Sequence, residues 1–141
     1  MTRGSGAAAI GRLHHLVVDC PDPRGLAAFW SAVLGQDVTY ADDDFVVVAP
    51  SERHSGLAFQ RAPDHQPPEW GDPARPQQMH LDVMVDDVPA AHARVLALGA
   101  RRLTGAPPGA GEGDVYADPA GHPFCLVPRP GWAPPVGDGR A

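Results

Sequence analysis

The chain repeats itself with an offset of 65 residues, and this repeat limits its possible folds more than any other feature. The matched positions are His15 and His80, Leu16 and Leu81, Asp22 and Asp87, and the segments 56–60 and 121–125. Chance supplies one or two such matches, but hardly all of them in the same order. The repeat therefore indicates two copies of one supersecondary unit that pack together.

The first copy has the pattern of one strand, one helix and three further strands. Residues 13–19 form a short β-rich run. A helix is predicted from Asp22-Pro23, because Asp caps free backbone N–H groups and Pro fits the first helical position. This helix carries an apolar stripe at helical spacing and ends at Gly35. The further strands are predicted at 38–41, 45–48 and 56–61.

The second copy repeats this order. A strand is predicted at 79–85, followed by a helix from Asp87 to Leu98 that ends at Gly99. The remaining strands are predicted at 101–104, 114–117 and 122–127, with the turn Asp118-Pro119-Ala120-Gly121 between the last two. The fold class that follows is α+β. Two tandem βαβββ modules, related by a pseudo-twofold axis, would form a cleft-shaped mixed β-sheet with the helices outside.

The chain of 141 residues is long enough for one domain and too short for two ordinary ones. We expect a single domain over 12–128, made of module 1 (12–62) and module 2 (78–128). The termini, 1–11 and 129–141, are expected to be flexible. A domain of this size can bury a core without the help of metals or disulfides.

Charge and cysteine content exclude several functions. The formal net charge of −6 argues against nucleic acid as a partner, since phosphate binding needs a basic surface. No stretch approaches the ~20 apolar residues of a membrane span, so no membrane association is expected. Cys20 and Cys125 lie far apart without CxxC spacing, which favours reduced thiols and a cytoplasmic location.

His15 and His80 occupy the same position of the repeat, near the start of the first strand of each copy. A pseudo-twofold axis would aim both imidazoles into the cleft, where they could bind a divalent metal or act as acid and base. An ordinary surface or hydrogen-bonded role is the alternative for each.

Gln60 and Cys125 form a second equivalent pair, on the last strand of each copy. Side chains alternate along a strand, so the core-forming Phe59 and Phe124 would leave this polar pair facing the cleft. Gln60 offers an oxygen ligand or a hydrogen bond to a substrate. Cys125 could be a metal ligand, a nucleophile if its pKa were lowered, or an inert apolar filler.

Trp70 lies in the long connection 62–77 between the copies, where an aromatic ring could stack on an apolar ligand or simply anchor the loop. Three other histidines, at 54, 65 and 122, fall in loops or turns and look incidental. Phosphate-binding glycine loops and the GxSxG and HExxH motifs are absent.

These motifs together resemble the vicinal oxygen chelate superfamily: glyoxalase I, bleomycin-resistance proteins, fosfomycin-resistance proteins and extradiol dioxygenases. The resemblance rests on His15 with Asp22-Pro23 and Phe29-Trp30, on 57–60, on 80–83, and on Asp118-Pro119-Ala120-Gly121 leading into 124–127. It is strongest for the glyoxalase-like branch of small bacterial proteins and covers about residues 13–128.

The resemblance implies a ligand pocket and a possible metal site. By position, the family's metal ligands correspond to His15, Gln60, His80 and Cys125, of which His15, His80 and Gln60 form the expected set. Metal enzymes of the family usually have Glu where this chain has Cys125. Mn, Fe or Ni would favour the oxygen and imidazole ligands, whereas a thiolate would favour Zn. The predicted ligand pocket comprises His15, Gln60, Trp70, His80 and Cys125.

Three functions follow as expectations. The chain binds a small molecule in the cleft, with its catalytic status open. Alternatively, it is a divalent-metal-dependent isomerase, lyase or dioxygenase that uses His15 and His80, or a metal-free protein that sequesters an antibiotic. Acid–base catalysis without a metal by His15 or His80 is a further possibility. The family resemblance also implies a homodimer.

Overall fold

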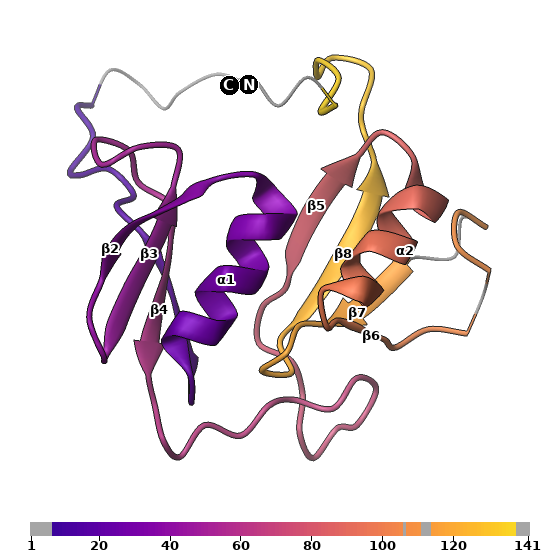
Figure 1. Ribbon diagram of the computed structural model, residues 1–141, viewed down its shortest axis with the longest axis horizontal. Helices are drawn as coiled ribbons and strands as arrows, with labels where there is room; N and C mark the ends of the chain where they lie inside the picture. Colours follow the sequence, from indigo (N-terminus) through magenta and orange to yellow (C-terminus); the bar gives the residue numbers. More distant parts are fainter. Residues whose placement is uncertain (1–6, 106, 111–113, 138–141) are drawn as a thin grey trace.

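The computed structural model describes residues 7–105, 107–110 and 114–137. Two four-stranded mixed sheets lie side by side, each accompanied by one helix (Figure 1). This confirms the predicted α+β architecture of two βαβββ modules. The outermost parts of the expected flexible termini, 1–6 and 138–141, lie outside the described residues.

Module 1 consists of β1 (Leu16–Cys20), α1 (Pro23–Leu34), β2 (Asp37–Ala41), β3 (Phe45–Ala49) and β4 (Leu57–Arg61). Its strands follow the order β1-β4-β3-β2. β1 runs parallel to β4 in the register Leu16 to Leu57, and the other pairs are antiparallel. The chain passes through α1, β2 and β3 before β4 pairs with β1. β1 has β4 as its neighbour on one side and forms an edge of the sheet.

Module 2 repeats this topology with β5 (Leu81–Val85), α2 (Val88–Ala97), β6 (Arg101–Arg102), β7 (Asp114–Ala117) and β8 (Pro123–Pro128). The strand order is β5-β8-β7-β6, with β5 parallel to β8. Leu81 pairs with Phe124 and Asp82 pairs with Cys125. Residues at matched positions of the sequence repeat thus occupy matched positions in the two sheets.

The helices begin where the capping residues predict. The Asp22 carboxylate accepts a hydrogen bond from Gly25 N at 3.1 Å, and the Asp87 carboxylate accepts one from Ala90 N at 3.0 Å. Gly35 ends α1 in the left-handed conformation, with a φ of 63° that side chains other than glycine rarely adopt. Each cap satisfies backbone groups that a helix end would otherwise leave unpaired.

The core joins the two modules, and α1 is at its centre. Phe29 and Trp30 of α1 both contact Phe124 of β8, with ring centroids 6.0 Å and 5.1 Å apart. α1 therefore lies between the two sheets, where its apolar face covers module 1 and also contacts module 2 (Figure 1). The sequence predicts both helices outside the sheets, whereas α1 packs against both modules. The reason is that the rings of Phe29 and Trp30 both contact Phe124 of module 2.

The segment 129–137 makes specific contacts, although the sequence suggests a flexible tail. Arg129 Nε donates to Asp86 Oδ1 at 2.7 Å, and the backbone N–H groups of Val136 and Gly137 donate to the same carboxylate. These donors, first the Val136 N–H and then Arg129, hold the pKa of Asp86 below its ordinary value. Within the described ranges, no helix is long and apolar enough to cross a membrane.

Candidate functional site between the modules

A cavity of about 470 Å³ lies between the two modules. Module 1 contributes the edge strand β1, Leu57 and Phe59 of β4, and Trp30 of α1. Module 2 contributes His80 and Leu81 together with the turn after β7, and the connection between the modules lines the remaining side. Most of the walls are apolar. Cavities of this size and character commonly hold a small molecule.

The buried carboxylate of Asp118 forms the polar end of this cavity. Its side chain is 1% exposed. Oδ2 accepts a hydrogen bond from Trp30 Nε1 at 3.0 Å, and Oδ1 accepts from Ala120 N and His122 N at 3.0 Å and 2.9 Å. His122 Nδ1 lies 3.2 Å from the same Oδ1. A buried carboxylate is tolerated when it is hydrogen-bonded in this way.

The predicted turn Asp118-Pro119-Ala120-Gly121 places this carboxylate and His122. Gly121 N donates to Asp118 O at 2.8 Å, and Asp118 N donates to His122 O at 2.9 Å. Gly121 has a φ of 93°, and a Cβ atom at this position would overlap Pro67 of the inter-module connection. The glycine therefore allows the turn and the connection to lie in direct contact.

The contact between Gly121 and Pro67 brings together two histidines, His65 and His122, to which the sequence analysis assigns no function. His65, in the connection, lies parallel to His122 with ring centroids 4.8 Å apart and an interplanar angle of 27°. Both rings line the cavity. His65 Nε2 is buried and has no hydrogen-bond partner among the described residues, which costs about 1–3 kcal/mol. In the sequence, the one feature that agrees with the placement of His122 is its position four residues after Asp118.

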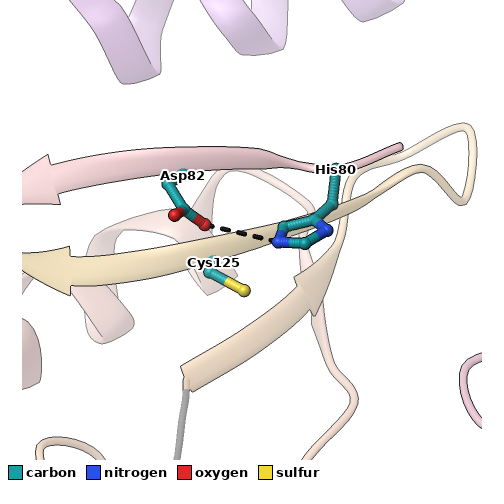
Figure 2. A group of neighbouring side chains, drawn as sticks. All are labelled: His80, Asp82 and Cys125. Atoms are coloured by element: carbon teal, nitrogen blue, oxygen red, sulfur yellow. Dashed lines mark ion pairs between the residues drawn. The ribbon is translucent and has the colours of Figure 1, made fainter.

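His80 belongs to a second group, on the face of the second sheet opposite the core. His80, Asp82 and Cys125 each offer one ligand atom, and these atoms lie within 4.8 Å of one another. Figure 2 shows the three side chains directed toward one another, His80 and Asp82 from the start of β5 and Cys125 from β8. His80 Nε2 lies 3.5 Å from Asp82 Oδ1. An imidazole, a carboxylate and a thiol form a donor set that suits Zn²⁺.

Burial of the thiol, followed by the charge and hydrogen bond of Asp82, raises the pKa of Cys125. The thiol is therefore protonated near neutral pH when no cation is bound. This excludes the activated nucleophile that a lowered pKa would have produced. A bound metal would have to displace the thiol proton, as metal binding to cysteine generally does.

Among the other predicted site residues, Trp70 contacts the second group, whereas His15 and Gln60 belong to neither group. His15 Nδ1 accepts a hydrogen bond from Gly56 N at 3.1 Å, and its ring is tilted by 31° against the His14 ring, with centroids 3.7 Å apart. Gln60 is exposed at the end of β4. Trp70, 39% exposed, contacts His80 edge to face at 6.4 Å. The structure thus brings Trp70, His80 and Cys125 near one another, but it groups neither His15 nor Gln60 with them.

The comparisons with known proteins agree with this architecture. The model of the family described as glyoxalase-like domain matches residues 15–127. The chain belongs to the glyoxalase-like domain family. The resemblance to glyoxalase and bleomycin-resistance proteins, inferred from the sequence, is thereby confirmed. No curated protein matches the sequence.

Solved structures with the same fold include proteins of different activities. A glyoxalase-related enzyme from Fulvimarina pelagi is 22% identical, with a TM-score of 0.61 and coverage of 86% of this chain and 90% of that one. A bleomycin-binding protein from Streptomyces verticillus, complexed with copper(II)-bleomycin, is 20% identical, with a TM-score of 0.53 and coverage of 86% and 100%. Glyoxalase I from Leishmania major is 18% identical, with a TM-score of 0.57 and coverage of 84% and 86%. At these identities the likeness shows the fold alone.

The contact between Gly121 and Pro67 predicts the effect of one substitution. Gly121→Ala should lower the free energy of unfolding by about 2 kcal/mol or more, because Ala combines an unfavourable positive φ with the overlap at Pro67. Gly71→Ala is the matched control, since Gly71 has a φ of 86° and nothing within 4 Å of its Cβ position. Its cost should be only about 1 kcal/mol. Urea unfolding measures both. Equal losses would contradict the tight contact.

Proposed function

We propose that this glyoxalase-like domain binds a small, largely apolar molecule in the cavity between its two modules. The observation that carries the proposal is the cavity of about 470 Å³, to which both modules and their connection contribute. Leu16, Phe59 and Trp30 supply apolar surface, whereas Asp118, His122 and His80 are among the polar residues of the lining. A few polar groups in an apolar pocket orient a ligand, whether or not a reaction follows.

Two of the predicted pocket residues support this proposal. His80 lines the cavity, and Trp70 contacts the His80 ring. Antibiotic sequestration is an alternative to this binding function. Copper(II)-bleomycin is a probe for that alternative alone, since the Streptomyces verticillus protein binds this compound.

Ligand binding in the cavity can be tested with an apolar probe and with a variant whose larger side chain fills the cavity. Naphthalene should shift the NMR resonance of the Trp30 indole N–H, since this side chain lines the cavity. Leu16→Trp places extra volume in the cavity from β1 and should weaken binding at least about tenfold, a loss of about 1.4 kcal/mol. Val38→Trp, at a 45% exposed position of β2 that does not line the cavity, is the matched control. Equal affinity of the two variants would contradict the proposed site.

A metal-dependent function is the second candidate, and the cluster of His80, Asp82 and Cys125 favours it. Three protein ligands leave an open position at Zn²⁺, as in catalytic zinc sites. When bound, the ion would act as a Lewis acid toward an oxygen of the ligand. This donor set differs from the set expected from the sequence, His15, His80 and Gln60, because His15 and Gln60 belong to the first sheet.

Zinc content after incubation and dialysis, measured by elemental mass spectrometry, separates the two ligand sets. The wild type should retain about one equivalent of Zn²⁺. Cys125→Ser and Asp82→Ala should lose most of it, whereas His15→Ala should retain it. Loss in His15→Ala together with retention in Asp82→Ala would support the sequence-derived set instead. A wild type without zinc would contradict the site at His80, Asp82 and Cys125.

Two further expectations stay proposals. A homodimer agrees with the exposed edges of the sheets, since β1 and β5 each pair on one side only. A cytoplasmic location agrees with Cys20 and Cys125, which are both free thiols.

A further inference from the structure

The polar end of the cavity contains an Asp–His pair with a defined hydrogen-bonding direction. The two oxygens of Asp118 accept hydrogen bonds from Trp30 Nε1 and from two backbone N–H groups, so the ionised carboxylate acts as an acceptor. A carboxylate can only accept. His122 Nδ1, 3.2 Å from Asp118 Oδ1, must then carry the hydrogen and donate it.

In the neutral form of His122 with its hydrogen on Nδ1, Nε2 is an acceptor. In a neutral imidazole, one nitrogen carries the hydrogen and the other has a free lone pair. Within the described part of the chain, Nε2 forms no hydrogen bond, and the side chain is 23% exposed. The ring lines the cavity. A ligand in the cavity therefore meets a hydrogen-bond acceptor whose direction is fixed by the buried carboxylate behind it.

The neighbouring His65 gives an independent indication that a polar ligand group belongs at this end. Its ring stacks on His122, and its Nε2 is buried without a partner among the described residues. Buried polar atoms are rarely left unpaired. A ligand atom that donates to one imidazole and accepts from the other would satisfy both, and a hydroxyl group has both properties.

The surroundings also restrict the charge of the ligand. The buried Asp118 carboxylate lies close to His122, and the lining also includes Pro67, Pro123 and Phe59. The other charged side chains of the described lining are Asp19 and Arg75, and Arg75 pairs with Glu69 at 3.5 Å. An anion would be repelled by the carboxylate and would lose its hydration against apolar walls. The chemistry of this end therefore suits a neutral molecule.

We propose that the stacked pair His122 and His65, positioned by Asp118, recognises a neutral apolar molecule with one hydroxyl group. The hydroxyl donates its hydrogen to His122 Nε2, and the apolar body occupies the space lined by Leu57, Phe59 and Trp30. This inference rests on the proposed binding function and names the substrate class of the same cavity.

Two probes that differ only in the hydroxyl hydrogen test the proposal. 1-Naphthol has this hydrogen, and 1-methoxynaphthalene lacks it. NMR titration of the Trp30 indole N–H gives the affinity of each probe, with the 80% exposed Trp132 as an internal reference. The wild type should bind 1-naphthol about 2- to 10-fold more tightly, the contribution of one hydrogen bond.

His122→Phe should abolish this preference for 1-naphthol over 1-methoxynaphthalene, because the hydrogen-bond acceptor is removed. His54→Phe is the matched control, since His54 lies in an exposed loop and bonds to Ser51. Comparing each variant with the wild type cancels the different hydration of the two probes. A preference that persists in His122→Phe contradicts the proposal.

A measurement on the wild type keeps the proposal testable if a variant fails to fold. Long-range ¹H–¹⁵N spectra should show His122 with its hydrogen on Nδ1, and the Nε2 resonance should move with 1-naphthol but not with 1-methoxynaphthalene. A hydrogen on Nε2, or equal responses to both probes, overturns the hydroxyl inference alone. Failure of both probes, and of naphthalene, to bind overturns the proposed binding function as well.

Discussion

The hydrogen bond from Trp30 to Asp118 is the interaction on which the rest of the structure depends. It joins α1 of module 1 to the turn after β7 of module 2, with both partners almost fully buried. The carboxylate also orders its own turn and holds His122 at the cavity. Any packing that removed these donors would leave the buried carboxylate unpaired, which costs free energy. The same contact therefore fixes how the modules meet and what chemistry their cavity presents.

Much of the fold follows from local sequence rules. The repeat predicts two βαβββ modules, and Asp22 and Asp87 cap both helices as expected. Phe59 and Phe124 are buried, as the strand alternation predicts, while Gln60 is exposed and Cys125 is half-buried. The alternation also predicts that Gln60 and Cys125 face the cleft, but the lining of the cavity includes Phe59 and neither of these two residues. The helix caps and the strand alternation depend on residues a few positions apart, so one sequence is enough to predict them.

The site is less accessible to sequence analysis because it depends on contacts between distant segments. His65 and His122 stack only because Gly121 lets the turn approach Pro67, and neither histidine has a recognisable pattern of its own. Asp82 joins His80 and Cys125 through the parallel register of β5 and β8, which the repeat alone does not give. His15 matches His80 by repeat position, yet the two belong to different sheets whose arrangement is set by the aromatic side chains of α1.

A double-mutant cycle on Trp30→Phe and Asp118→Asn, followed by urea unfolding, tests the central claim most directly. Hydrogen bonds to charged groups contribute about 1.5–3 kcal/mol. If the two side chains join the modules as described, the coupling free energy should fall in this range, with the double variant less destabilised than the sum of the single ones. Additivity within about 0.5 kcal/mol would show that the two residues act independently, and would contradict an account in which Asp118 organises both the module interface and the cavity.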